Sequence, residues 1–278
     1  MRWTTHRRRC WCPRPRSRRR STPSSRSAIR KTSSRTPSPA DYGAAAARYD
    51  ELRPQDAAWW ELFDVLAREG DLVGRRVLDV GCGTGRWAAA LAERGSRVWA
   101  IDPSPEMVEQ ARRRGVRAKV AQAESLPFKE GWFERALLVL VVHVLDRPRV
   151  FGELRRVLAD EGRVAIATFD RRHFDDYYLN PYFPSLADID RARFPTSEDL
   201  IAELEATGFQ ARVHDVELVS AYDRQTALER IRGRFISTLR MIGEAEFAEG
   251  VARAERDLPD RVEARQHMLA MVAVRRPL

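Results

Sequence analysis

The sequence predicts an α/β fold in which a mostly parallel sheet of seven strands carries helices on both faces. Three observations lead to this prediction. From about residue 75 onward, short apolar segments alternate with segments of helical spacing, as in a chain of strand–helix units. A glycine-rich turn directly follows the first apolar segment. Two further segments near the end of the chain have strand character and complete the seven.

The first strand–helix unit surrounds the motif VLDVGCGTG. Residues 75–80 read as a buried parallel strand, because their apolar side chains leave little room for a polar face. Gly81, Gly83 and Gly85 lack a Cβ atom, so they can adopt positive φ and let a ligand approach the backbone closely. The alanine-rich segment 86–94 then has helical spacing. The unit therefore reads as strand, ligand-binding loop and helix.

The second unit places an acidic residue where such a loop needs one. A strand over residues 97–101 ends at Asp102, about twenty residues after the first glycine. Parallel α/β folds that bind nucleotide-like ligands use a carboxylate at this point to hold ribose hydroxyls. Ser104 and Pro105 are then suited to the N-cap and first position of a helix that runs to Arg114.

The remaining elements follow from the same patterns. The apolar segment 137–142 and its neighbours are far shorter than the roughly 20 residues that span a bilayer, so they predict a central strand and no membrane span. The other predicted elements are strands 117–120, 163–169, 210–219 and 267–274, and helices 150–158 and 196–207.

The spacing of the glycines distinguishes between classes of cofactor. Dinucleotide-binding loops use G-x-G-x-x-G, but Arg86 occupies the position of the third glycine here. The pattern G-x-G-x-G preceded by Asp79 instead resembles the first motif of the class I S-adenosylmethionine-dependent methyltransferases. The resemblance implies that S-adenosylmethionine is the cofactor, that the loop passes its methionine part and that Asp102 holds both ribose hydroxyls. It also implies a Rossmann-like fold with a terminal antiparallel hairpin.

The resemblance covers about residues 42–276. It extends to the small-molecule branch, including ubiquinone and menaquinone biosynthesis methyltransferases, whose members share the LPF and VLDVGCGTG phrases. The segment AQAESLPF resembles the adenine loop of the family, which places Ala123 and Glu124 beside the adenine ring. Many relatives carry an acid at the position of Gln122, whose side-chain carbonyl can accept the same hydrogen bonds. The cofactor residues that the resemblance implies are Tyr49, Asp79, Gly81, Cys82, Gly83, Thr84, Gly85, Asp102, Pro103, Met107, Gln122, Ala123, Glu124 and Leu140.

The expected reaction is methyl transfer to a small organic acceptor that an aromatic lid aligns for in-line displacement. His143 follows the fourth predicted strand, at the edge where such sheets form active sites, and is the candidate general base; a packing histidine is the alternative interpretation. Aromatic segments 42–63 and 174–183 favour an aromatic or lipophilic acceptor, although the same side chains can close the core or form a subunit contact. The candidate substrate residues are Arg53, His173, Tyr177 and Tyr178.

The first 40 residues differ in composition from the rest of the chain. They hold 13 of the 49 basic residues and no acidic residue, and 30 of the 40 positions are Arg, Ser, Thr or Pro. Such a segment cannot bury a core, so we expect a disordered leader at 1–40 and one domain at 41–278. The leader has three interpretations: an unstructured tail or a start-site or frame artefact, a targeting segment, and a nucleic-acid-binding arm.

Composition excludes other classes. The segment 41–278 carries 36 basic against 40 acidic residues, so the basic pI of the whole chain says little about nucleic acid, which we do not expect as a partner. Cys82 is the one cysteine outside the leader, which excludes a disulfide framework, and we expect no metal and a cytoplasmic location. Two alternative functions remain at this stage: an RNA or protein methyltransferase that docks through the leader, and a non-enzymatic S-adenosylmethionine-binding regulatory protein.

Overall fold

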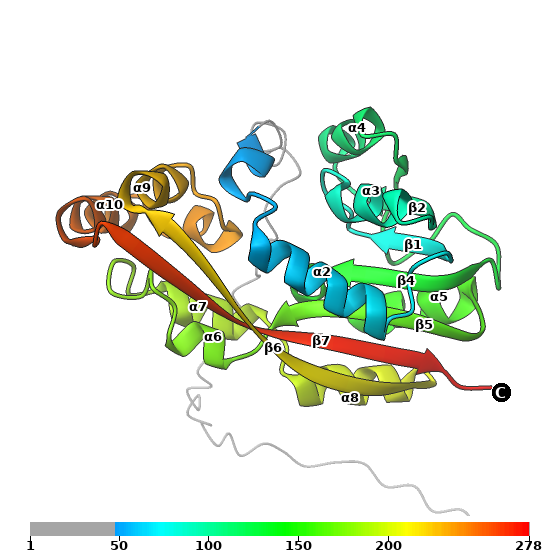
Figure 1. Cartoon of the computed structure of the whole chain (residues 1–278). Coiled ribbons are helices and arrows are strands. Elements are labelled where there is room, and N and C mark those ends of the chain that lie inside the picture. Colours follow the sequence, from blue (N-terminus) through cyan, green and yellow to red (C-terminus); the bar gives the residue numbers. More distant parts are fainter. Residues whose placement is uncertain (1–47, 278) are drawn as a thin grey trace, which may run out of the picture. The chain divides into compact units, whose positions relative to one another are not determined.

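The computed structural model describes residues 48–277, so the predicted leader and the first part of the predicted lid lie outside the described residues. The chain forms one seven-stranded sheet in the order β3-β2-β1-β4-β5-β7-β6 (Figure 1). Its strands are β1 Arg76–Val80, β2 Arg97–Asp102, β3 Arg117–Val120, β4 Phe133–Val139, β5 Leu158–Phe169, β6 Phe209–Asp223 and β7 Arg261–Arg275. The first five strands pair in parallel, whereas β7 pairs antiparallel with both β5 and β6. The predicted fold class and terminal hairpin are confirmed.

Helices cover both faces of the sheet because neighbouring residues of each strand point to opposite faces. Val77 of β1 belongs to the hydrophobic cluster beneath α2, α3 and α4, and Leu78 belongs to the cluster beneath α5 and α8. The α-helices are α2 Ala57–Glu69, α3 Arg86–Glu93, α4 Pro105–Arg113, α5 Arg147–Val157, α6 Arg172–Asp175, α7 Leu186–Arg193, α8 Ser197–Ala206, α9 Arg224–Arg232 and α10 Glu244–Asp257, and the 3-10 helices are η1 Val142–Val144 and η2 Ser237–Arg240. Within residues 48–277, none of these helices has the length and apolar character needed to cross a membrane.

The start of α4 forms as its sequence predicts. The Ser104 hydroxyl accepts a hydrogen bond from the backbone N–H of Met107 at 3.2 Å, and Pro105 occupies the first turn. The N-cap of α8 is a capping box, in which Thr196 and Asp199 each accept a hydrogen bond from the backbone N–H of the other. Both caps fix the residue at which a helix begins.

The fourth strand is displaced from its predicted position. The sequence predicts residues 137–142, but β4 runs from Phe133 to Val139. Leu140 has a φ of +52°, which ends the extended conformation, and η1 follows immediately. The apolar run is therefore shared between a strand and a turn, and hydrophobicity alone does not mark the boundary.

The hairpin between β6 and β7 is longer than its sequence pattern predicts. The two strands pair over fifteen positions, from Phe209 opposite Arg275 to Asp223 opposite Arg261. The chain between them forms α9, η2 and α10, which the sequence analysis did not predict and which lie at the far end of the hairpin (Figure 1). These helices share a third hydrophobic cluster with α7 and with Leu52. The C-terminal part thus has a core of its own.

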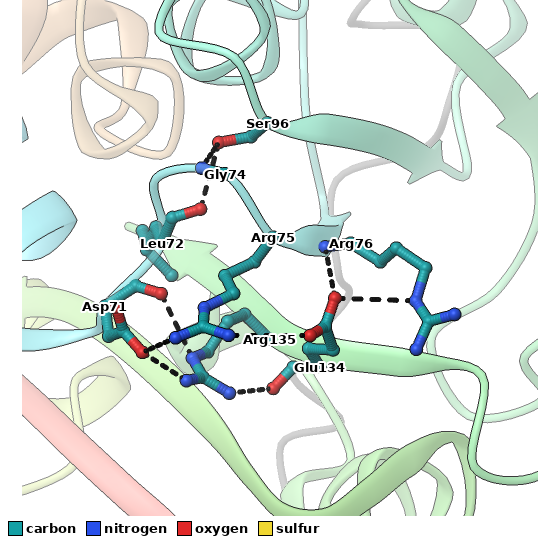
Figure 2. Close-up of polar contacts among 8 residues, drawn as sticks. All are labelled: Asp71, Leu72, Gly74, Arg75, Arg76, Ser96, Glu134 and Arg135. Carbon is teal, nitrogen blue, oxygen red and sulfur yellow. Dashed lines mark hydrogen bonds and ion pairs between the residues drawn. The ribbon is translucent and has the colours of Figure 1, made fainter.

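A polar network closes the sheet at the amino ends of β1 and β4 (Figure 2). The Asp71 carboxylate pairs with Arg75 at 2.8 Å and with Arg135, and Glu134 pairs with Arg76 at 3.5 Å. Burial alone would raise the pKa of Asp71, but the charges and hydrogen bonds of the two guanidinium groups outweigh it and hold that pKa below its usual value.

Arg135→Ala is expected to destabilise the chain by about 2–4 kcal/mol. The buried guanidinium of Arg135 donates to the Asp71 and Glu134 backbone carbonyls at 3.1 and 2.7 Å, and its removal leaves these acceptors without a partner. Arg75→Ala is the matched control, since Arg75 binds the same carboxylate from a side chain that is 40% exposed and should cost below about 1 kcal/mol. Urea denaturation measures both, and equal losses would contradict this account.

Candidate cofactor and acceptor site

The glycine loop after β1 is held against β2 and leaves one side open. The backbone N–H groups of Gly81 and Cys82 donate to the Ile101 carbonyl at 2.8 and 3.0 Å. Gly81 has a φ of +72°, and a Cβ atom there would lie 2.6 Å from a methyl group of Val141. At Gly83, with a φ of +53°, a Cβ atom would meet no heavy atom of the described residues within 4 Å. The loop therefore packs tightly at its start and can receive a ligand at Gly83.

Asp102 ends β2 directly beside this loop. Its carboxylate accepts hydrogen bonds from the backbone N–H groups of Gly83 and Ser104, both at 2.9 Å. Burial raises the pKa of Asp102, and these two hydrogen bonds oppose the rise. Each carboxylate oxygen can accept a second hydrogen bond. The residue therefore fixes the loop and keeps acceptor capacity for two hydroxyl groups of a ligand.

Asp79 is a buried carboxylate with an unused oxygen. The residue is 2% exposed, and its Oδ2 atom has no hydrogen-bond partner in residues 48–277. Burial raises the pKa of Asp79 to about 7, and the neighbouring Asp102 charge contributes to the rise. A backbone hydrogen bond from Ala88 opposes the rise, but a buried carboxylate oxygen without a donor is still costly, so the site fits a ligand that brings a positive charge or a donor. S-adenosylmethionine carries positive charges on its sulfonium and ammonium groups.

The other predicted cofactor residues lie in the segments that follow β1, β2, β3 and β4. The segment after β3 leaves the sheet at Ala121, whose N–H donates to the Asp102 carbonyl at 3.2 Å. Glu124 accepts a hydrogen bond from the backbone N–H of Asp146 at 3.2 Å, which holds this segment against the start of α5. Cys82 is buried, and burial raises the pKa of its thiol, so it is not a reactive thiolate. Pro103 follows Asp102, Met107 is buried in α4, Gln122 and Ala123 lie in the segment after β3, and Leu140 lies in the turn after β4.

The N-terminal segment 48–53 contacts the glycine loop through Asp50, which the sequence analysis did not predict. The Asp50 carboxylate accepts a hydrogen bond from the Thr84 hydroxyl at 2.8 Å and pairs with Arg86 at 3.1 Å and with Arg114. Three residues on, Arg53 donates to the Phe235 carbonyl at 2.7 Å. Tyr49 lies against Arg53, whose guanidinium carbon is 4.4 Å from the centre of its ring. The segment 48–53 therefore joins the glycine loop to the C-terminal helices.

His143 lies in η1, after the carboxyl end of β4. Its ring stacks on Phe194 with 4.0 Å between ring centres, and its Nδ1 atom is buried without a hydrogen-bond partner among the described residues. Burial lowers the pKa of His143 to about 3, and the positive charges of Arg193 and Arg53 add to this effect. The imidazole is therefore neutral near pH 7 and weakly basic, which favours hydrogen bonding over proton abstraction as its function.

The predicted substrate residues form a row of rings that starts at the carboxyl end of β5. His173 stacks on Phe169, the last residue of β5, with 4.1 Å between ring centres. Tyr177 follows at 4.6 Å from His173, and Tyr178 at 5.1 Å from Tyr177. The structure thus brings His173, Tyr177 and Tyr178 together. Arg53 lies in the N-terminal segment instead, where it contacts Tyr49 and the Phe235 carbonyl.

Comparisons with known proteins agree with this geometry. A family model described as a methyltransferase domain matches residues 78–166, from the middle of β1 to β5. The malonyl-[acyl-carrier protein] O-methyltransferase of Herminiimonas arsenicoxydans is 31% identical over 204 residues, which cover 69% of this chain and 74% of that protein. The chain belongs to the class I S-adenosylmethionine-dependent methyltransferases. The enzyme of the same name from Geobacter sulfurreducens is 33% identical over 186 residues, covering 62% of this chain and 67% of the relative.

Other matches to this chain are partial or show the fold alone. The chain spans about a quarter of the biotin biosynthesis bifunctional protein BioHC of Cellvibrio japonicus, with 37% identity over 132 residues that cover 46% of this chain and 26% of the relative. It spans about half of an uncharacterized methyltransferase of Mycobacterium bovis, with 33% identity over 140 residues that cover 49% of this chain and 54% of the relative. A solved putative methyltransferase from an antibiotic biosynthesis pathway of Anabaena variabilis has a TM-score of 0.60 at 21% identity, covering 76% of this chain and 96% of that chain.

Proposed function

We propose that this chain transfers a methyl group from S-adenosylmethionine to a small organic acceptor. The observation that carries the proposal is the pair of buried carboxylates beside an open glycine loop. Asp102 would hold the ribose hydroxyls, and Asp79 would face a positive charge of the cofactor. Gly83 would allow the cofactor to approach the backbone.

The protein's own contribution is alignment and exclusion of water. When bound, S-adenosylmethionine supplies an electrophilic methyl group on its sulfonium, so the cofactor carries the difficult step. The row of rings from Phe169 to Tyr178 lies at the carboxyl edge of the sheet and would place the acceptor. The segment 48–53 would close over the loop through Asp50 and Arg53. Oriented reactants in a dry site react far faster than free ones, without need of a strong base.

Carboxylic acids are one class of acceptor to test first. Two relatives are named malonyl-[acyl-carrier protein] O-methyltransferases. The cofactor loop and the aromatic row of this chain would also serve an O-methyl transfer. The aromatic row also suits phenols and quinone precursors, because flat rings stack well on its side chains.

The test is calorimetric titration of the full chain with S-adenosylmethionine and, separately, with NAD. Micromolar binding of S-adenosylmethionine alone supports the cofactor, and binding of NAD instead contradicts it. Release of S-adenosylhomocysteine is then measured with carboxylic acids and phenols as acceptors. Cofactor binding without product from any small acceptor, protein or RNA would favour a regulatory protein, and product only with RNA or protein would reject the small acceptor.

A further inference from the structure

Arg230, on the buried side of α9, has a positive charge that the described part of the chain does not neutralise. The residue is 8% exposed, and its Nε and Nη1 atoms have no hydrogen-bond partner among residues 48–277. Its guanidinium carbon lies 4.0 Å from the ring centre of Tyr222 and 4.4 Å from that of Phe235. These cation–π contacts stabilise the charge but satisfy none of its N–H groups.

A buried cation of this kind is costly unless it serves a ligand. Removing a charge from water without a paired anion is strongly unfavourable, and buried arginines are therefore almost always paired. The one buried carboxylate of the neighbouring α7, Asp190, is already engaged by the Thr238 hydroxyl at 2.5 Å and by Arg193 at 3.4 Å. The charge of Arg230 is thus left without a carboxylate partner among residues 48–277 and is available to an added anion.

Arg230 packs on Tyr222 and Phe235, which share one hydrophobic cluster with Tyr177 and Tyr178 of the aromatic row. Its charge acts on the hydroxyl groups of Tyr177 and Tyr178, and it opposes the rise in their pKa that burial causes. The Tyr178 hydroxyl is itself buried without a partner in residues 48–277 and can donate a hydrogen bond. Phe235, which packs on Arg230, also accepts the hydrogen bond from Arg53 of the segment over the glycine loop.

Further buried polar atoms near the aromatic row have no hydrogen-bond partner among residues 48–277. They are the Nδ1 atoms of His143 and His173, both buried. His143 follows β4 and stacks on Phe194, which packs against Phe169 of the row, so both imidazoles lie near the carboxyl ends of β4 and β5. Several buried polar atoms without partners in one region indicate a place for a polar ligand.

We propose that Arg230, with the Tyr178 hydroxyl, forms an anion subsite that binds a carboxylate group of the acceptor. The proposal rests on the proposed methyl transfer to a small molecule and narrows its acceptors to carboxylic acids. A carboxylate matches the single charge of the guanidinium and accepts hydrogen bonds from both donors. The aromatic row between Arg230 and β5 would hold the apolar part of the same molecule.

The test compares Arg230→Met with Arg232→Met, an exposed arginine of the same helix that pairs with Glu255. The probes are benzoate and hexanoate, each matched with its uncharged amide, added to protein saturated with S-adenosylhomocysteine. We expect the carboxylates to bind wild type and Arg232→Met at least tenfold more tightly than the amides, and Arg230→Met to lose this preference. Equal binding of acids and amides by wild type, or an unchanged preference in Arg230→Met, would overturn the proposal.

Melting without ligand gives a second, independent readout. If Arg230 serves a ligand, Arg230→Met removes an unpaired buried charge and should raise the melting temperature, whereas a purely structural arginine should lower it. Titration with S-adenosylmethionine keeps the two proposals apart. Loss of cofactor binding in wild type would reject the proposed function, whereas normal cofactor binding without carboxylate preference would reject the anion subsite alone.

Discussion

Asp102→Ala is expected to weaken S-adenosylmethionine binding by about 100-fold or more. The carboxylate would lose two hydrogen bonds to ribose hydroxyls, and hydrogen bonds to charged groups contribute about 1.5–3 kcal/mol each. It would also lose its hydrogen bonds to the N–H groups of Gly83 and Ser104, which hold the loop in its binding conformation. Both losses act in the same direction. Calorimetric titration of the purified variant measures the change.

Two further variants keep this result interpretable. Asp102→Asn retains the shape of the side chain and one strong acceptor, so it should bind the cofactor more tightly than Asp102→Ala and less tightly than wild type. Glu109→Ala removes an exposed carboxylate from α4, where Glu109 pairs only with Arg113 at 3.3 Å, and should bind as wild type does. An Asp102→Ala protein that stays folded and binds with unchanged affinity would reject the cofactor site.

Local sequence patterns predict the parallel half of this fold well. The strand ending at Asp102, the Ser104 cap and the third strand, 117–120, are confirmed. Each depends on short-range features, namely apolar runs, caps and glycine stops. The boundary at Val139 was missed because Leu140 remains apolar while its backbone turns. The helices between β6 and β7 were missed because their apolar positions face a separate core that no local pattern reveals.

The residues of the candidate site also fall into those that local sequence patterns predict and those that they do not. The motif locates the glycine loop and its two carboxylates, because these residues lie within one strand–helix–strand unit. Asp50 and Arg230 gave no such signal. The partners of Asp50 are 34 to 64 residues away, and Arg230 looks like any arginine of a surface helix until its burial is known. Residues that act through tertiary contacts of this kind can be identified only from the structure.

Asp79→Asn is expected to stabilise the ligand-free chain at pH 8 while weakening cofactor binding at least tenfold. The folded pKa of Asp79, about 7, lies above the value near 3.8 of an unburied aspartate. From about pH 4 to 7 the unfolded chain therefore releases this proton and the folded chain does not, so stability falls as pH rises, by about 1.4 kcal/mol per unit. Below about pH 4 both the folded and the unfolded chain hold the proton, so Asp79 causes no loss of stability there. An amide at this position does not titrate and avoids the loss.

The difference in stability between wild type and Asp79→Asn at each pH reports the titration of Asp79 alone. Burial of His143 and His173 lowers their pKa to about 3, which reduces stability below about pH 6.5, but it does so equally in wild type and variant. The advantage of Asp79→Asn should therefore grow from pH 4 to pH 8 in urea denaturation, to a few kcal/mol. Asp64→Asn, at an exposed carboxylate paired with Arg94, should show no such trend. Saturating S-adenosylmethionine should shrink the advantage, because its positive charge then faces the carboxylate and not the amide. Parallel pH profiles of wild type and Asp79→Asn would mean that Asp79 is ionised and partnered in the folded chain, and its assignment to the cofactor would fail.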